Sequence, residues 1–531
     1  MILCFGVRAE AQVSHGGTPY FNRNVSGMKA PSWQLPVVEH KTLLEEDALQ
    51  TKWGSPMRIG VMQPTTLDLL KEATVIREDG LTHYVLSVTS PGATSLSLHF
   101  SDFALPVGAR MYFYDASGRF VLGAFRSEDV LRDGTFYTQA IPGDKVFVEY
   151  TVPASAEPGQ VVIDQVCHGY KDILSTLPED LWQADGAKGP HGSAEQTCHP
   201  NVACPEGDGW RDEIRSTVAI EIHSGSNAYM CTGTLVNNTN QDRTPYVLSA
   251  FHCQNVGNVT GLVFYFLYET YDCDGTTGVS NKSMTGAATM AKKSMNNGSD
   301  FWLMRLNQEI PDEYQPYFAG WDRREVGSHT PGICIHHPGG DFKKLSIPQS
   351  VSGQDDDYRD FWEVTWLRVN NKGVTEPGSS GSGLFNGEHR LIGTLTGGLS
   401  DCDDLFGRDY YGRFDVSWNR GTDSTNSLRY WLDPVGTDAV TLDGMDETAS
   451  GIGSHDNLLA LSFEVYPNPA QDIVNISTED FVRADILDMQ GRIVISATRT
   501  PVRIQALSEG IYLIRLYTKE GMGVARMVKC R

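Results

Sequence analysis

Short segments in which apolar and polar residues alternate recur along the chain, and they constrain the fold more than any other feature. Examples are "SLSLHF" (95–100), "KVFVEYTV" (145–152), "TVAIEIH" (217–223) and "GIYLIRLYT" (510–518). A period of two indicates strands with one buried face, and short strands joined by turns are typical of antiparallel sandwiches and barrels. Gly is abundant, at 53 of 531 residues, which suits turn-rich β folds. We therefore predict a mainly β protein.

Changes in this pattern divide the chain into sections. Residues 12–188 carry strands of sandwich type and end in a stretch without periodicity that we interpret as an exposed linker. Residues 189–445 carry many shorter strands, which suggest a double β-barrel. Residues 446–460 form a polar Gly/Ser linker, and residues 461–531 alternate again as a small β-sandwich would.

Helix signals are few in the middle section. The clearest is "TDSTNSLRYWLDP", in which Asp423 or Ser424 could cap a helix and Pro434 would end it. We expect one late helix there.

The charge and the apolar runs exclude several classes of partner. The formal net charge of −23 argues against nucleic acid, because phosphate binding needs a basic surface. No stretch approaches about 18 consecutive apolar residues, so no transmembrane helix is predicted. Residues 1–11 have a short apolar start and the small-x-small pattern Ala9-Glu10-Ala11 that signal peptidases cut. We interpret them as the remnant of a signal peptide; the alternative is an untidy N-terminus without a role in export.

The ten cysteines are unevenly distributed, and six of them are clustered in the middle section. No C-x-x-C pair occurs, so an even, clustered set favours disulfides in an oxidising compartment over zinc ligands. Sequence alone leaves 15 pairings of six cysteines open. The clustered six are Cys198, Cys204, Cys231, Cys253, Cys273 and Cys402; Cys334 also lies in this section, whereas Cys4, Cys167 and Cys530 are isolated near or beyond its borders.

The segment "TEPGSSGSGLF" (375–385) is either a flexible loop or the bend that presents a nucleophilic serine. Serine needs a histidine to take its proton and a buried carboxylate to orient that histidine. It also needs backbone N–H groups that face the developing oxyanion, which favours neighbouring glycines. Ser380 is the serine with this setting.

His252 and Asp300 are the best partners for Ser380. His252 ends the apolar strand "PYVLSAFHC", and Asp300 opens the apolar strand of "SDFWLMRL". Taken alone, each has a plainer interpretation, as a structural histidine or a strand-capping aspartate. Together they follow the order His…Asp…Ser of chymotrypsin-type peptidases, and the G-x-S-x-G elbow of α/β-hydrolases fails at Ser382.

The middle section contains the long motifs "CTGTLVNNTNQDRTPYVLSAFHC", "SDFWLMRLN", "IHHPGGDFKKLS" and "GVTEPGSSGSGLF". In sequence and order these motifs resemble the secreted lysyl endopeptidases of the trypsin-like clan. The resemblance implies that His252 is the general base, Asp300 its orienting carboxylate and Ser380 the nucleophile. It also implies that the N–H groups of Gly378 and Ser380 form the oxyanion hole.

The resemblance also implies disulfides and processing. The implied pairs are Cys198–Cys402, Cys204–Cys273 and Cys231–Cys253. An active secreted peptidase needs restraint before export, so residues 12–188 are predicted to be a propeptide. A lysine-specific enzyme could itself cut between Lys188 and Gly189; the alternative is an ordinary exposed lysine.

Substrate recognition departs from ordinary trypsin. The position six residues before Ser380, where trypsin has its specificity aspartate, is Val374, and the residue before Ser380 is Ser379, which excludes trypsin's activating ion pair. By resemblance Asp409 lies at the base of the pocket, where a buried carboxylate would favour a cationic side chain. The resemblance implies lysine, and a compact ammonium suits such a point charge, whereas arginine would need room for a planar fork.

The resemblance further implies that Thr396, Gly397 and Gly398 wall the pocket and bind the substrate backbone. Thr396 stands where a family member has histidine. Asp401, Asp403 and Asp404 precede Asp409 in an acidic loop, in which Asp403 and Asp404 are interpreted as solvated surface residues.

The pair His336-His337 raises the alternative of a metal site. No acidic or cysteine ligand stands at a zinc spacing, and the H-E-x-x-H motif is absent. The same "IHHP" occurs in the family, so we expect a structural role and no metal or other cofactor.

The last section resembles the sorting domains of the type IX secretion system. The motifs are "VYPNPAQD" (465–472), "ILDMQGRIV" (486–494) and "LSEGIYLIRL" (507–516). They imply that the type IX machinery is a partner and that the protein is secreted or held at the cell surface.

These observations predict a secreted serine endopeptidase that cuts protein or peptide substrates after lysine. A broader Lys/Arg protease and a catalytically silent surface adhesin on the same fold remain the alternatives.

Overall fold

The computed structural model describes residues 14–21, 30–49, 53–131, 133–173, 198–257, 259–275, 278, 282–354, 358–367, 373–400, 402, 406–446, 463–478, 481–487, 493–518 and 521–530. The predicted signal remnant, Lys188 and Gly189, and the linker beyond Asp446 lie outside these ranges. The chain divides into two compact units, Met1–Ser450 and Gly451–Arg531. Within the described ranges every helix is too short or too polar to serve as a membrane span.

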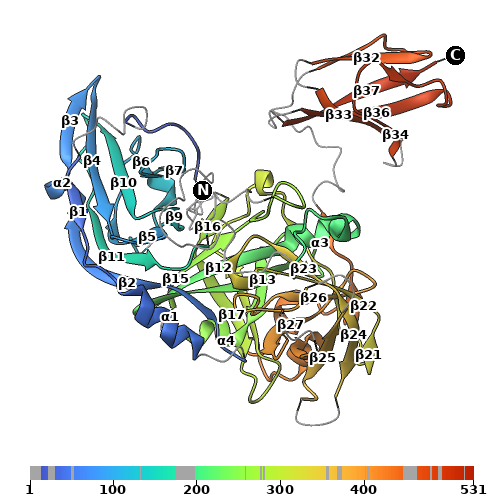
Figure 1. Ribbon diagram of the computed structural model, residues 1–531, viewed down its shortest axis with the longest axis horizontal. Helices are drawn as coiled ribbons and strands as arrows, with labels where there is room; N and C mark the ends of the chain where they lie inside the picture. The colour runs from blue at the N-terminus through green and yellow to red at the C-terminus, as the bar shows by residue number, and fades with distance from the viewer. Residues whose placement is uncertain are drawn as a thin grey trace, which may run out of the picture. The chain divides into compact units, whose positions relative to one another are not determined.

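The N-terminal part of the first unit is a sandwich of two sheets (Figure 1). One sheet has the order β1-β4-β10-β6-β7 with β3 on β4, and the other contains β2, β11, β5, β8 and β9. Buried side chains of both sheets, among them Leu86, Phe100, Phe113 and Val166, fill the space between them. The elements are β1 (Ser32–Gln34), α1 (His40–Ala48), β2 (Met57–Asp68), α2 (Leu69–Glu72), β3 (Thr74–Glu78), β4 (Leu81–Thr89), β5 (Ser95–Phe103), β6 (Arg110–Asp115), β7 (Val121–Phe125), β8 (Phe136–Tyr137), β9 (Ile141–Pro142), β10 (Lys145–Pro153) and β11 (Val161–Gly169).

Two barrel-like sheets follow. The first runs β16-β15-β12-β13 and continues through β14, β18 and β17. Its elements are α3 (Arg211–Ser216), β12 (Thr217–Ser224), β13 (Asn227–Val236), β14 (Tyr246–Ala250), α4 (Phe251–Gln254), β15 (Val259–Tyr265), β16 (Ser283–Thr285), β17 (Ala287–Lys293) and β18 (Phe301–Leu306).

The second barrel-like sheet has the order β21-β24-β25-β28-β27-β26-β22-β23, with β20 beside β27. The prediction of a mainly β protein with a chymotrypsin-like double barrel is confirmed. The elements are β19 (Tyr317–Phe318), β20 (Trp321–Asp322), β21 (Ser328–His329), β22 (Pro331–His336), β23 (Lys344–Ser346), β24 (Pro348–Gly353), β25 (Phe361–Trp366), β26 (Gly383–Asn386), β27 (Leu391–Gly398), β28 (Asp409–Arg413), α5 (Phe414–Asn419), α6 (Arg429–Leu432), β29 (Thr441–Leu442) and β30 (Met445–Asp446).

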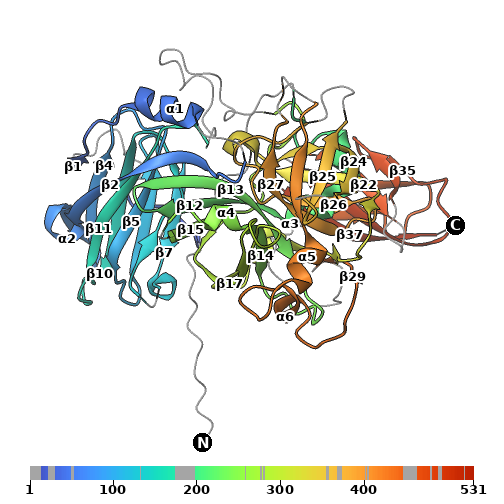
Figure 2. The same ribbon diagram turned by 90° about the horizontal axis from the view of Figure 1, so that it is seen from below.

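The sandwich and the first barrel share one continuous sheet. Strand β2 pairs antiparallel with β13, with Met57 opposite Met230 and Val61 opposite Asn227, and Figure 2 shows the two strands side by side. Met57, Ile59, Met62, Ala140, Cys167 and Ile173 of the N-terminal part pack in one buried core with residues of the barrel such as Ala219, Ala228, Met230, Val263 and Phe342. The N-terminal part is therefore joined to the barrel by both backbone pairing and apolar packing.

The predicted late helix is shorter than expected. Helix α6 spans only Arg429–Leu432, and residues 422–426 form a turn instead. Asp423 Oδ1 accepts the Thr425 N–H at 2.8 Å, and Asn426 Oδ1 accepts the Thr422 N–H at 2.7 Å. Such side-chain bonds to nearby backbone compete with helix formation, which is why the expected cap at Asp423 does not start a helix.

The second unit is built from two small sheets around its own core. Their orders are β31-β32-β35 and β34-β33-β36-β37. Buried Val474, Ile486, Ile514, Leu516 and Met527 lie between them. The elements are β31 (Glu464–Tyr466), β32 (Ile473–Ser477), β33 (Phe481–Leu487), β34 (Ile493–Ala497), β35 (Val502–Arg503), β36 (Gly510–Thr518) and β37 (Gly521–Lys529).

A histidine pair lies inside the N-terminal part. The Nε2 atoms of His40 and His168 are 2.7 Å apart, and His168 Nδ1 lies 2.7 Å from Ser90 Oγ. Burial and then the neighbouring His40 lower the pKa of His168 to about 4. An unfolded histidine titrates near pH 6.5, so the unfolded chain binds this proton more tightly than the folded one.

We therefore expect the N-terminal part to lose stability as the pH falls from about 6.5 to about 4. Hydrogen exchange of β4 and β11, measured on the full chain with Ser380→Ala, should show weaker protection at pH 5 than at pH 7. The variant His168→Asn keeps a polar partner for Ser90 but does not titrate, so its protection should depend less on pH. An equally steep pH dependence in both proteins would show that His168 is not the group responsible.

Candidate active site

His252 and Asp300 are brought together by the pairing of two strands. Strand β14 pairs with β18 so that Ala250 lies opposite Phe301, which places the residues flanking these two side by side. The Asp300 carboxylate receives two hydrogen bonds from His252, from its backbone N–H to Oδ1 at 3.0 Å and between Nδ1 and Oδ2 at 2.7 Å. Asp300 is fully buried and His252 is 4% exposed.

These contacts determine which nitrogen of the His252 imidazole carries the proton. An ionised carboxylate only accepts hydrogen bonds, so Nδ1 of His252 carries the proton that faces Asp300. In the neutral ring Nε2 then carries a lone pair and no proton, and this nitrogen has no hydrogen-bond partner among the described residues. His252 is thus oriented to take a proton at Nε2.

Ser380 lies next to this pair, in the loop between β25 and β26. Its carbonyl accepts the Thr232 N–H of β13 at 2.8 Å and lies 3.8 Å from Sγ of Cys253, the residue that follows His252. No hydrogen bond joins Ser380 Oγ to His252 Nε2. This bond is often long in unliganded enzymes and tightens only when substrate binds.

The glycines around Ser380 are required by its bend. Gly378 and Gly381 have φ values of +96° and +81°. A Cβ on Gly381 would lie 2.1 Å from Ser249 Oγ, and one on Gly378 would lie 2.6 Å from the His337 carbonyl oxygen. No side chain fits at either position, so the loop is a compact bend and not a flexible tip.

The backbone N–H groups of this bend fall into two sets. Ser379 donates to the Glu376 carbonyl at 3.0 Å and Gly381 to the Leu395 carbonyl at 2.9 Å. The N–H groups of Gly378 and Ser380, the predicted oxyanion donors, donate to no acceptor within the described part of the chain. They are therefore free to bind an oxygen of a ligand.

A chain of hydrogen bonds supports the bend from below. Ser346 Oγ donates to the Val374 carbonyl at 2.7 Å, so it must accept from Nε2 of His336 at 2.9 Å. Nδ1 of His336 then accepts from Ser379 Oγ at 2.7 Å, and that oxygen accepts the Glu376 N–H at 3.1 Å. Ser379 is thus held by a neutral buried network, where trypsin has an ion pair.

His337 also has a protein partner. Its Nδ1 donates to the Asp341 carbonyl at 2.9 Å, and its ring stacks on Tyr268. Burial lowers the pKa of His337 to about 3, so the ring is neutral. The imidazoles of the "HH" pair are therefore oriented by hydrogen bonds from the surrounding loops.

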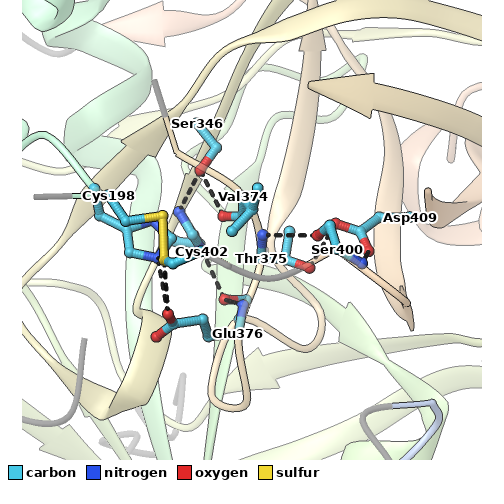
Figure 3. The surroundings of a disulfide bond; sticks show 11 residues. Cys198, Ser346, Val374, Thr375, Glu376, Ser400, Cys402 and Asp409 are labelled. Atoms are coloured by element: carbon cyan, nitrogen blue, oxygen red, sulfur yellow. Dashed lines mark hydrogen bonds and ion pairs between the residues drawn. A yellow bond between two sulfur atoms is a disulfide. The ribbon is translucent and has the colours of Figure 1, made fainter. Parts of the chain in front are cut away.

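Asp409 opens β28 and is completely buried. Its Oδ2 accepts hydrogen bonds from Trp366 Nε1 at 2.7 Å and Thr375 Oγ1 at 2.8 Å, and also from Ser400 Oγ. Among the described residues, its Oδ1 accepts only the long bond from the Ser400 N–H at 3.3 Å, which leaves capacity for a further donor. Figure 3 shows Thr375 and Ser400 beside Asp409, with Val374 next to Thr375.

The predicted pocket walls lie on the strand next to Asp409. Gly398 of β27 pairs with Asp409, and a Cβ on Gly398 would lie 2.0 Å from the Asp409 Oδ1 atom. Thr396 is buried, and its Oγ1 has no hydrogen-bond partner among the described residues. Asp401, Asp403 and Asp404 lie outside the described residues.

Sequence reasoning missed the donors around Asp409. Thr375 belongs to the motif of Ser380, and Ser400 follows Gly398 by two residues, so closeness to predicted site residues was a usable signal. Trp366 comes from β25, and no local pattern marks it as a partner of Asp409.

The structure contains the disulfides Cys198–Cys402, Cys204–Cys273 and Cys231–Cys253. These are the pairs that the family resemblance implies. Cys231–Cys253 ties the residue after His252 to β13. Cys198–Cys402 lies beside Glu376, at the start of the Ser380 bend (Figure 3).

Cys334 is a buried free cysteine. It accepts a hydrogen bond from the Tyr411 hydroxyl at 3.1 Å. Burial raises the pKa of Cys334 to about 12, so its sulfur stays a thiol and is not a nucleophile at neutral pH.

Two regions of the chain match known protein families. Residues 192–412 match the family model for the lysyl endopeptidase C-terminal domain, and residues 464–529 match the model for the secretion system C-terminal sorting domain. A lysyl endopeptidase of Pseudomonas aeruginosa is 29% identical over 378 residues, which cover 67% of this chain and 78% of that protein.

Solved structures with similarity to the chain include protease Anisep from Arthrobacter nicotinovorans and human heparin binding protein. The first is 14% identical, with a TM-score of 0.29, and covers 40% of this chain and 93% of its own. The second is 17% identical, with a TM-score of 0.31, and covers 45% of this chain and 96% of its own.

The two matched regions account for the two functional parts of the chain. The sorting domain indicates export through the type IX secretion system to the cell surface or the medium. The chain is thus a secreted serine endopeptidase whose residues 192–412 are similar to the lysyl endopeptidase C-terminal domain, and it carries a C-terminal sorting domain.

Proposed function

We propose that this protein hydrolyses peptide bonds on the carboxyl side of lysine through a Ser380–His252–Asp300 triad. The observation that carries the proposal is the double hydrogen bond from His252 to the buried Asp300 carboxylate. It holds the imidazole in the tautomer that a general base needs.

The reaction has two halves. His252 Nε2 takes the proton of Ser380 Oγ as this oxygen attacks the scissile carbonyl, and it then gives the proton to the leaving amine. Water, activated by the same nitrogen, hydrolyses the acyl-enzyme. Asp300 stabilises the imidazolium that forms in each half and stays ionised.

The free N–H groups of Gly378 and Ser380 bind the oxyanion of the tetrahedral intermediates. Such donors act strongly because they are oriented before the reaction begins. The network Ser379–His336–Ser346 holds this bend, so its positioning does not depend on a new N-terminus created by processing.

Asp409 is the acceptor for the substrate's ammonium group. Three donors occupy Oδ2, and Oδ1 retains free capacity, so the pocket offers one oxygen as a point charge. An ammonium group matches a single acceptor, whereas a guanidinium needs two parallel ones. This geometry favours lysine over arginine, in accord with the name of the Pseudomonas aeruginosa relative.

The remaining parts of the chain fit a secreted precursor. Residues 12–188 act as the propeptide, and Lys188–Gly189 is a cleavage site that the enzyme can process itself. The C-terminal domain is the part that the type IX machinery binds.

If the triad is correct, substitutions in it should cause a large and specific loss of catalytic activity. Asp300→Asn should lower kcat about 10⁴-fold, because the amide stabilises the wrong tautomer of His252. Ser380→Ala should abolish labelling by a fluorophosphonate probe, which the processed wild type should take up at Ser380. Asp415→Asn, which removes another buried carboxylate of this domain, is the matched control and should stay within about tenfold of the wild type. Absence of label at Ser380 in the processed wild type would favour the silent adhesin.

The supporting network predicts an effect on kcat. Ser379→Ala breaks the link between the bend and His336, so kcat should fall about tenfold while KM changes little. Ser427→Ala is the control, since this buried hydroxyl donates to the Trp418 carbonyl instead. An equal fall in kcat in both variants would mean that the fall reflects general destabilisation of the domain and not the loss of the link to His336.

If Asp409 binds the substrate's ammonium group, neutralising it should weaken the preference for lysine peptides. Asp409→Asn should lower kcat/KM for lysine peptides by about 10²–10³, the cost of removing one partner from a buried charge pair. Glu376→Gln, whose parent carboxylate lies 3.2 Å from His199, is the control for a general change of charge.

The wild type should prefer lysine over arginine at least about tenfold. Equal turnover of lysine and arginine peptides would exclude lysine specificity.

A further inference from the structure

The N-terminal part reaches the predicted substrate cleft through a segment of four residues. Pairing of β2 with β13 fixes Met57 opposite Met230, and Met57 is 5% exposed. The chain just before it, Trp53–Pro56, therefore starts from a rigid point on the barrel. The pairing of β2 with β13 therefore sets the position of this segment on the barrel.

This segment lies between the residues assigned to substrate binding. The Gly54 N–H donates to the Thr396 carbonyl at 3.2 Å. At the other end of the segment, a Cβ placed on Gly378 would lie 3.4 Å from Met57 Sδ. The segment thus extends from the backbone of β27 to the bend that carries Ser380. A substrate N–H cannot bind the Thr396 carbonyl while the Gly54 N–H donates to it.

Trp53 packs in a cluster of aromatic side chains beside the pocket. Its ring centroid is 5.4 Å from Tyr410, 5.8 Å from Tyr358 and 6.4 Å from Phe361. Tyr358 and Tyr410 stack on each other at 4.7 Å, and Tyr410 directly follows Asp409. We name Tyr358, Phe361 and Tyr410 the aromatic subsite.

The neighbouring strand leaves the aromatic subsite open. Gly397 of β27 pairs with Tyr410 of β28, and residues paired in this way face the same side of a sheet. Because Gly397 has no side chain, it leaves Tyr410 uncovered, and Trp53 of the N-terminal part lies against Tyr410. Tyr358 is still 40% exposed with Trp53 in place.

We propose that the aromatic subsite binds an aromatic side chain of the substrate on the N-terminal side of the scissile bond. In the precursor Trp53 fills the same subsite and keeps the cleft closed. This inference rests on the proposed function, because it takes Thr396–Gly398 as the strand along which the substrate lies. Aromatic rings prefer the edge-to-face and offset contacts that Trp53 makes here.

Peptides with one lysine test the subsite in the processed enzyme. Trp or Phe is compared with Ala at each of the four positions before lysine. We expect the aromatic residue to raise kcat/KM about fivefold at one of these positions. Tyr358→Ala should reduce that ratio towards one, whereas Tyr271→Ala, which removes an exposed tyrosine of the same domain, should keep it. A ratio of one at every position in the wild type, or an unchanged ratio in Tyr358→Ala, would overturn the subsite.

The intact full-length precursor tests the role of Trp53. Fluorophosphonate labelling of Ser380 should be about tenfold faster in Trp53→Ala than in the wild-type precursor, and Trp53→Phe should stay near the wild type. Equal labelling rates in all three precursors would overturn occupation of the cleft. Labelling of the processed wild type reports on the nucleophile itself. Its failure would count against the proposed function and not against this inference alone.

Discussion

The buried carboxylate of Asp300 is the group around which the rest of the site is arranged. A charge without access to water is tolerated only when hydrogen bonds replace its hydration. Both oxygens are satisfied by His252, through its backbone N–H and its ring. The pairing of β14 with β18 and the disulfide Cys231–Cys253 hold that residue in place. The barrel therefore holds His252 in one tautomer, and the Ser380 bend is built against it.

The second barrel carries another set of buried polar groups, under the proposed pocket. Asp409 is satisfied mainly by Trp366 of β25, by Thr375 of the loop that leads to Ser380, and by Ser400, which lies just after β27. Thr375 also belongs to the loop that ends in Ser380. Asp409, the proposed pocket base, and Ser380, the proposed nucleophile, therefore both depend on one loop, and that loop is held by His336 and Ser346. In this arrangement the activating ion pair of trypsin has no place, because Ser379 is already bonded.

The N-terminal part is more than an appended domain. Its strand β2 extends the sheet of the first barrel, and the two share an apolar core. Removing the N-terminal part would expose the edge of β13 and the apolar residues beneath it. If processing separates it from the barrel, as proposed, we expect the two parts to stay tightly bound until the N-terminal part unfolds. The acid-sensitive pair His40–His168 lies within this part and gives it a pH-dependent stability.

Much of the site followed from sequence because its residues lie in local motifs. His252 ends an apolar segment, Asp300 begins one, and Ser380 lies in a Gly/Ser-rich motif; the structure places the first two in contact and Ser380 beside them. The shared sheet could not be predicted, because strand partners distant in sequence leave no local pattern. The contact of Trp366 with Asp409 and the placement of Trp53 on Tyr410 were missed for the same reason. The helix expected at Asp423 was wrong in extent, because Asp and Asn side chains there bind the local backbone.

The central claim is that Ser380 becomes acylated during turnover with His252 as its base. Rapid-quench kinetics with a lysine ester, combined with mass spectrometry of the quenched processed enzyme, tests this claim directly. The account predicts a burst of product close to one equivalent per enzyme and a lysyl adduct on the peptide that contains Ser380. A linear time course without a burst, together with an adduct on any other residue, would contradict it.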